Sequence, residues 1–319
     1  MTPAFRRALA IVAGVGALAT VMATLAPRDA AAFVRYKTAS GIPFAWQQTC
    51  VPVTYYPNSM LDGAGHMNMT PDQIAHAVST SAATWSAAAN PCSFLIINTE
   101  SSAAAAPTAV YDKRNSLIFD STWCGPRDGS GNCTYDGLAL AITSVFVVTS
   151  TGVIKDADIE INTQNFTWAD LDLEPPGSDK QDLQNAVTHE MGHMIGLDHT
   201  CYMNGEATRQ IDNNGNPVPD CATAPADVRA TTMFASADAG DIQKRTLADD
   251  DKAAVCAIYP VANDPMMCPT AADPTGSTSS GCHCAVDPAR GRATFVAPGL
   301  LVAAALWARA RRRRAGPAA

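Results

Sequence analysis

Between residues 33 and 260, short apolar stretches alternate with three longer segments whose apolar positions recur at helical spacing. The short stretches have the length and pattern of strands, and we expect strands at 50–56, 94–98, 116–120, 138–148 and 157–162. The longer segments predict helices at 70–88, 178–195 and 247–258. This order predicts one α/β (α+β) domain, in which a twisted, mixed, five-stranded sheet is backed by the first two helices.

Both long helices begin with recognisable start signals. Thr70 suits the cap position of the first helix, and Gln73 stands where a capping box places Glu or Gln. Five residues form the apolar face of this helix: Ile74, Ala77, Val78, Ala82 and Trp85. We expect the second helix to begin near Ser178, with Asp179 and Asp182 in its first turn.

The first 32 residues have the pattern of a secretory signal peptide. Arg6 and Arg7 precede an apolar run at 8–26, and the alanines at 30–32 form an A-x-A cleavage pattern. A transmembrane anchor is the alternative, but the run is short and a cleavage site follows it. We therefore expect residues 1–32 to be removed on export, and the folded domain to occupy residues 33–260.

The C-terminal part of the chain divides into two segments. Residues 261–281 are rich in Pro, Ser, Thr and Gly and predict a linker, whereas 282–319 contains Cys282, Cys284, an apolar stretch at 293–308 and an arginine cluster. The second segment resembles the Cys-containing C-terminal sorting tails of myxobacterial surface proteins. The resemblance implies membrane or outer-surface attachment through the tail, which a sorting protease either processes or leaves in place. A zinc-binding or redox CxC pair is the alternative for the two cysteines.

Charge and cysteine content narrow the functional class. The formal net charge is −8, and the chain has neither an interior basic run nor a Gly-rich phosphate loop, which argues against nucleic acid as a partner. Ten cysteines in an exported chain favour structural disulfides. Plausible neighbours suggest four pairs, although sequence alone does not fix connectivity. These are Cys50 with Cys92, Cys124 with Cys133, Cys201 with Cys221, and Cys256 with Cys268.

Three of the six histidines lie in one short segment, HEMGHMIGLDH (189–199). On a helix, His189 and His193 project from one face and can hold the same metal ion. Gly196 allows the helix to end in a left-handed turn that brings His199 back to that ion. Three neutral nitrogen ligands leave a position open for water, which is typical of a catalytic zinc site.

Glu190 lies beside the histidines, where it can contact water without binding the metal. Its carboxylate can accept a proton from an attacking water, so the segment predicts metal-assisted hydrolysis with Glu190 as the general base. H-E-x-x-H alone is only suggestive in a chain of this length. Gly196 and His199 at fixed offsets make the pattern far more specific.

The segment DLQNAVTHEMGHMIGLDHT (182–200) resembles the active-site helix of the matrixin family of metzincin zinc proteases. The similarity covers about residues 40–260. It implies a metzincin-like fold, one catalytic zinc ion on the three histidines, and protein or peptide substrates. ATTMFAS (230–236) is similar to the Met-turn of that family, which implies that Met233 packs beneath the metal and its histidines.

The same resemblance assigns ADIEIN (157–162) to the edge strand above the cleft, on which a substrate would lie antiparallel as an added strand. It also implies an apolar selectivity pocket beyond the zinc. Phe234 and Ala235 stand where matrixins commonly have Tyr and Pro, in the wall of that pocket. The chain therefore departs from the family at the residues that shape selectivity.

Calcium is a second candidate ion, at Asp156, at Asp158 or in the acidic loop 212–216 (DNNGN). A solvated loop is the interpretation that we favour for these residues. Two alternatives to a peptidase are a catalytically silent adhesion or binding module on a metzincin scaffold, and a structural zinc domain. The presence of Glu190 argues against the first, and the lack of an evident fourth protein ligand argues against the second.

Overall fold

The structure is a computed structural model that describes residues 32–57, 66–175, 177–203 and 208–268. The chain divides into two units, Met1–Gly276 and Ser277–Ala319, and all the described residues belong to the first. The predicted signal peptide (except Ala32), the predicted tail and most of the predicted linker lie outside the described residues. Within those residues, no helix is both long and apolar enough to cross a membrane.

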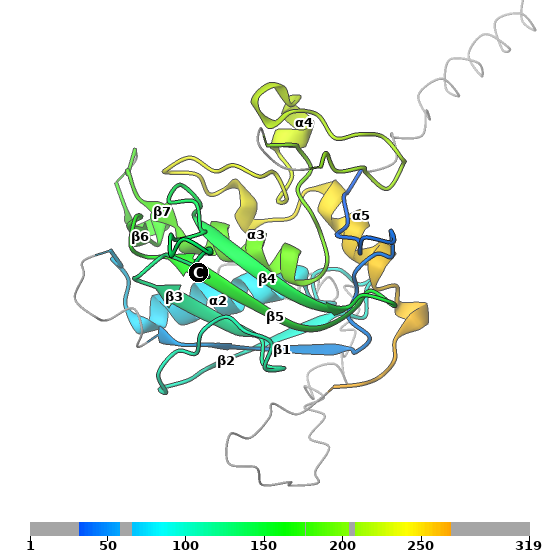
Figure 1. Ribbon diagram of the computed structural model, residues 1–319, viewed down its shortest axis with the longest axis horizontal. Helices are drawn as coiled ribbons and strands as arrows, with labels where there is room; N and C mark the ends of the chain where they lie inside the picture. Colours follow the sequence, from blue (N-terminus) through cyan, green and yellow to red (C-terminus); the bar gives the residue numbers. More distant parts are fainter. Residues whose placement is uncertain (1–31, 58–65, 176, 204–207, 269–319) are drawn as a thin grey trace, which may run out of the picture. The chain divides into compact units, whose positions relative to one another are not determined.

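A five-stranded mixed sheet forms the centre of the domain, with the strand order β2-β1-β3-β5-β4 (Figure 1). Its strands are β1 (Cys50–Tyr55), β2 (Ile96–Ser101), β3 (Ser116–Asp120), β4 (Ala141–Val148) and β5 (Val153–Asn162). The pairings among β2, β1, β3 and β5 are parallel, and β4 pairs antiparallel with β5. The predicted mixed five-stranded sheet is confirmed, and each strand overlaps a predicted one.

The prediction that ADIEIN (157–162) forms the edge of the sheet is wrong. These residues belong to β5, which pairs with β3 on one side and with β4 on the other. β5 is buried along nearly its whole length, as expected for a strand with two neighbours, whereas β4 is only half-buried. β4 is therefore the edge strand on this side of the sheet.

Two helices, α2 (Pro71–Trp85) and α3 (Leu183–Met194), pack against each other and back the sheet (Figure 1). α2 opens with the predicted capping box, in which the Thr70 hydroxyl accepts a hydrogen bond from the Gln73 amide and the Gln73 side chain accepts one from the Thr70 amide. All five residues of the predicted apolar face are buried. The last of them, Trp85, donates from Nε1 to Thr188 O on α3 at 2.8 Å, which joins the two helices.

α3 begins at Leu183 rather than near Ser178, so the predicted helix start is wrong. Asp182 is the N-cap residue, and its Oδ1 accepts a hydrogen bond from Asn185 N at 2.8 Å. A cap residue has non-helical dihedral angles, so helical structure starts at the next position. The preceding residues pair instead with another short strand.

Shorter elements surround this framework. A second, two-stranded sheet contains β6 (Trp168–Ala169) and β7 (Gln181–Asp182). The remaining helices are α4 (Ala226–Arg229), α5 (Asp249–Ile258) and the single 3-10 turns η2 (Leu171–Leu173), η3 (Cys221–Thr223), η4 (Gln243–Arg245) and η5 (Val261–Asn263). α5 corresponds to the predicted closing helix.

Four disulfide bonds join the described cysteines: Cys50–Cys268, Cys92–Cys256, Cys124–Cys133 and Cys201–Cys221. The last two confirm predicted pairs, and the first two replace the predicted Cys50–Cys92 and Cys256–Cys268 pairs. The reason is the path of the chain after α5, which returns to hydrogen-bond with the start of β1. Four disulfides are consistent with an exported protein.

Candidate metal centre

The three histidines of the 189–199 segment converge. Nε2 of His199 lies 3.3 Å from Nε2 of His189 and 3.1 Å from Nε2 of His193. Tetrahedral zinc with Zn–N bonds of about 2.05 Å has nitrogen–nitrogen edges of about 3.3 Å, so these two distances fit zinc. All three ligand atoms lie within 4.8 Å of one another. This group could hold one metal ion, and within the described ranges it is the only cluster of three or more His, Cys, Asp or Glu side chains that could do so.

The turn after α3 places the third histidine. Gly196 has a φ of +97°, in the left-handed region that favours glycine, and a Cβ at this position would lie 2.7 Å from Phe44 O. The turn also contacts the first residues of the domain, because Asp198 N donates a hydrogen bond to Val34 O at 3.0 Å. The Asp198 carboxylate accepts from His199 N at 2.8 Å and so caps the turn.

Backbone carbonyls fix the orientation of the two helical histidines. Nδ1 of His189 lies 2.6 Å from Thr232 O, and Nδ1 of His193 lies 2.9 Å from Leu197 O. A proton on each Nδ1 satisfies these contacts and leaves Nε2 with a lone pair for a metal. Burial lowers the pKa of both imidazoles well below the usual value, so both are held in the neutral form that binds metals.

Glu190 lines the same cavity as the histidines and is buried. The hydroxyl of Thr143, on the edge strand β4, donates a hydrogen bond to Oε2 of Glu190 at 2.6 Å. Burial raises the pKa of this carboxyl group, and the Thr143 hydrogen bond opposes the rise. The carboxylate is therefore oriented by the strand that borders the cavity.

Met233 packs against α3 at Gly192. Its side chain is buried, and a Cβ on Gly192 would overlap with Met233 Sδ. The carbonyl oxygen of Met233 accepts a hydrogen bond of 3.1 Å from the backbone amide of Thr200, the residue that follows the third histidine. Met233 thus packs against the helix and also fixes the chain that follows His199.

The three histidines, Glu190 and Thr143 line a cavity of about 490 Å³. Its lining includes the segment 138–143, which leads into β4, and the segment 235–237, which follows Met233. Asn185 and Ala186 add a contribution from α3. The structure thus brings Glu190 and the three histidines to one cavity beside the edge strand, with Gly196 and Met233 as supports.

Thr143 and Lys244 are among the residues of the cavity that the sequence did not single out. Lys244 is 3% exposed, its ammonium group donates to Phe234 O, and Nζ lies 3.4 Å from Nδ1 of His189. Burial lowers the pKa of Lys244 to about 8, although the nearby negative charges of Glu190 and Asp241 oppose the shift. Neither residue belongs to a local pattern that would have identified it.

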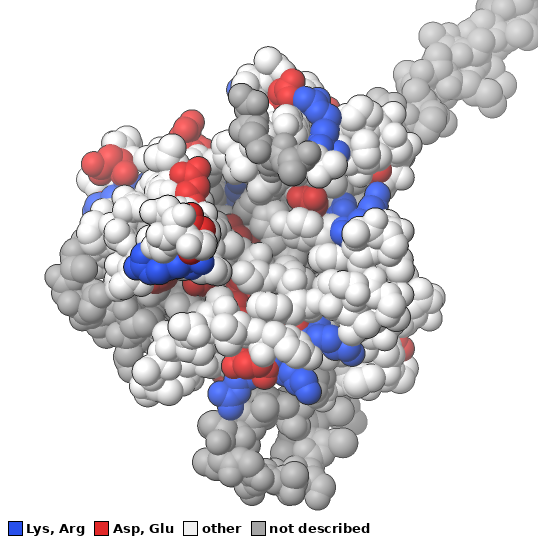
Figure 2. All heavy atoms as spheres, in the orientation of Figure 1, with Lys and Arg blue, Asp and Glu red and all other residues white. Residues whose placement is uncertain are grey.

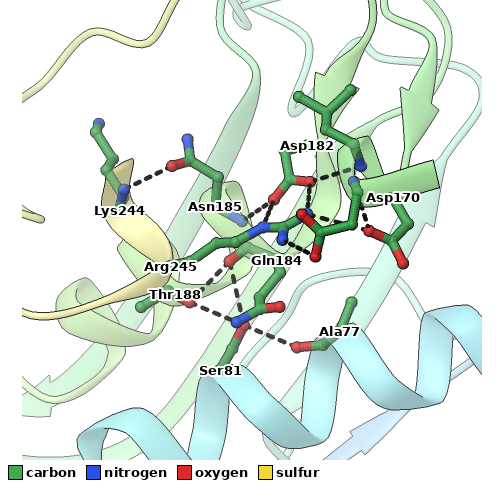
Figure 3. A network of polar contacts seen from close by, with 11 residues as sticks. Ala77, Ser81, Asp170, Asp182, Gln184, Asn185, Thr188, Lys244 and Arg245 are labelled. Carbon is green, nitrogen blue, oxygen red and sulfur yellow. Dashed lines mark hydrogen bonds and ion pairs between the residues drawn. The ribbon is translucent and has the colours of Figure 1, made fainter. Parts of the chain in front are cut away.

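A polar network fixes the start of α3 (Figure 3). Arg245 forms ion pairs with Asp182 at 2.5 Å, with Asp172 at 2.6 Å and with Asp170 at 3.1 Å. Its Nε also donates to Oδ1 of Asp182, the N-cap oxygen. The first turn of α3 is also held through Ser81 Oγ, which donates a hydrogen bond to Gln184 O at 3.2 Å. Both contacts restrain the helix that carries two of the histidines.

The acidic residues considered for calcium are engaged with the backbone. Asp156 Oδ2 accepts from two amides, and the two oxygens of Asp158 accept from Val110 N and Ser116 N. In the loop 212–216, Asp212 Oδ1 accepts from two amides of its own turn. Calcium at these positions stays a prediction. Figure 2 shows Lys and Arg scattered among other side chains on one face of the molecule, without a continuous basic area.

Comparison with known proteins finds no match: no protein-family model matches the chain, and no curated protein matches it. The matrixin resemblance therefore depends on the motifs quoted above.

Proposed function

We propose that this protein is an exported, matrixin-like zinc metalloendopeptidase that hydrolyses peptide bonds in proteins or peptides. The observation that carries the proposal is the convergence of the three histidines with Glu190 in one cavity beside the edge strand β4. Three neutral histidines with an adjacent carboxylate match the donor set of catalytic zinc sites.

The residues of the chain have distinct roles in this proposal. Bound zinc supplies Lewis acidity, which polarises the scissile carbonyl and makes water more acidic. Glu190 accepts the proton of the attacking water and then delivers it to the amine that leaves. Thr143 holds Oε2 of Glu190, so Oε1 is the oxygen left to exchange the proton. Met233 and Gly196 keep the histidines in position and take no part in the proton transfer.

The edge strand offers a binding mode for the substrate. β4 pairs with β5 on one side only, and residues 140–143 of this edge region line the cavity that contains Glu190. An extended peptide can add to such an edge through backbone hydrogen bonds, which places a peptide bond over the metal. β4 thus takes the role that the sequence resemblance had given to 157–162.

Four disulfides support export, and we propose that the C-terminal tail attaches the protein to a membrane or the cell surface, with processing by a sorting protease. Mass spectrometry of the mature protein tests the fate of both ends. Loss of residues 1–32 is expected. A mature protein that retains its arginine cluster would contradict processing of the tail.

The second candidate is a silent binding module on the same scaffold. A digestion assay with casein and gelatin separates the two candidates, and it uses the full chain produced by an exporting host. We expect cleavage that stops on chelation and returns when zinc is restored. No cleavage by zinc-loaded, folded protein would favour the binding module, and cleavage that persists after complete metal removal would contradict the zinc mechanism.

A further inference from the structure

Lys244 is a buried cation in the wall of the cavity. It belongs to the 3-10 turn η4, which follows the segment 235–237 along the chain, and both line the cavity. Only 3% of the residue is exposed. Among the described residues that line the cavity, it is the only Lys or Arg.

No carboxylate of the described residues forms an ion pair with the ammonium group of Lys244. The ammonium group donates to the carbonyl oxygen of Phe234. The carboxylates whose charges act on Lys244 are those of Glu190, Asp241 and Asp251, and each accepts a hydrogen bond from another group: Thr143 Oγ1, Asp238 N and Thr232 N. A buried cation without a carboxylate in contact is costly, and an anionic ligand in contact would lower that cost.

Other residues of the cavity wall can pack against the methylene groups of an acidic side chain. Apolar residues also line the cavity, including Leu140, Ile142, Ala186 and Ala235. Methylene groups of a bound side chain can pack against these residues while a carboxylate reaches the ammonium group. A cation in the wall of a binding cavity selects for charge in addition to size.

We propose that Lys244 makes this cavity selective for substrates with Asp or Glu beside the scissile bond. The proposal rests on the peptidase function and specifies its substrate class. The carboxylate of the substrate pairs with Nζ of Lys244, and the buried cation then has its counterion. This selectivity replaces the apolar selectivity that the family resemblance implies.

A purely structural role for Lys244 makes a different prediction. If the hydrogen bond from Lys244 to Phe234 O only supports the cavity wall, then loss of the ammonium group weakens the binding of every peptide to the same extent. If Lys244 recognises a carboxylate, loss of the ammonium group weakens the binding of acidic peptides alone. The ratio of affinities for matched peptides therefore distinguishes the two roles.

The test measures binding of cleavage-product peptides that begin with Glu or with the isosteric Gln, by calorimetry on the zinc-loaded full chain. We expect wild-type protein to prefer the Glu peptide by about tenfold or more, the magnitude of a buried hydrogen bond to a charged group. The preference should disappear in Lys244→Met and persist in Lys244→Arg. Lys252→Met is the control, because Lys252 is exposed and does not line the cavity.

Product peptides that end in Glu or Gln are measured in the same way, so that both sides of the scissile bond are tested. Equal affinity of wild-type protein for Glu and Gln peptides on both sides would overturn the proposal, whether or not any variant folds. Equal weakening of both peptides in Lys244→Met would also overturn it. Cleavage of a peptide library separates this failure from that of the proposed function: cleavage at apolar residues refutes only the acidic selectivity, whereas absence of cleavage refutes the peptidase.

Discussion

The hydroxyl of Thr143 donates a hydrogen bond of 2.6 Å to Oε2 of Glu190. The bond connects the edge strand β4 to the helix α3, across 47 residues of sequence. Because β4 is the strand on which we expect the substrate to lie, this contact places the proposed general base in a defined position relative to the scissile bond. The hydrogen bond also engages one of the two carboxylate oxygens of Glu190, which restricts the rotation of the carboxylate group.

Replacement of Thr143 by Val removes this bond and keeps the shape of the side chain. We expect zinc content to stay the same and kcat to fall about ten- to hundredfold, the value of a hydrogen bond to a charged group. The bond lowers the pKa of Glu190, so its loss raises that pKa and moves the acidic limb of the activity profile to higher pH. Thr143→Ser keeps the hydroxyl and is the control. An unchanged profile in Thr143→Val would contradict the role of this contact.

Gly196→Ala tests the turn that returns His199 to the metal. The substitution puts a Cβ 2.7 Å from Phe44 O at a positive φ, so we expect a loss of unfolding free energy of about 2 kcal/mol or more and weaker zinc binding. Gly41→Ala is the matched control, because Gly41 also has a positive φ but lies in open space. The control should lose about 1 kcal/mol and keep its zinc affinity. Equal zinc affinities in the two variants would contradict this account of the turn.

Arg245→Lys tests the network at the start of α3. Lysine keeps the charge but loses the planar group that contacts Asp182 with two nitrogens. Because this contact is largely buried, we expect chemical denaturation to show a loss of about 2 kcal/mol. Arg209→Lys is the control, since its ion pair with Asp220 is exposed and should contribute under about 1 kcal/mol. Equal losses in the two variants would contradict the structural importance of the network.

Asp158 should make stability depend on pH. Burial raises its pKa to about 7, so the folded state binds more protons than the unfolded state between about pH 4 and pH 7. The unfolding free energy should therefore fall as pH rises through this window. Asp158→Asn removes this contribution, which is at most about 1.4 kcal/mol per pH unit. Denaturation from pH 5 to pH 8 measures it, with the exposed Asp227→Asn as the control. Parallel curves for wild type and Asp158→Asn would refute the assignment.

The parts of the site that sequence analysis predicted depend on local geometry. The spacing of His189 and His193 on a helix, and a glycine before His199, fix a metal-binding arrangement within one short segment. The capping box at Thr70 and the approximate positions of the five strands were predicted for the same reason. Each follows from residues close together in the chain.

The features that were missed depend on contacts between distant segments. Which of two apolar strands forms the edge is decided by the neighbours of each strand, so β4 and β5 could not be told apart in advance. Cys50 pairs with Cys268 and Cys92 pairs with Cys256, and this choice of partners depends on where the chain returns after α5. Lys244 joins the cavity from a turn 55 residues beyond His189, and nothing in the sequence around it indicates a role there.

The central claim is that Glu190 acts as a general base beside zinc on three histidines. Its most direct test compares the zinc content and peptide turnover of Glu190→Ala with those of the wild-type full chain. We predict one zinc ion in each protein, and a loss of turnover of about 10²- to 10⁴-fold in the variant. Full turnover in zinc-loaded Glu190→Ala would contradict the mechanism.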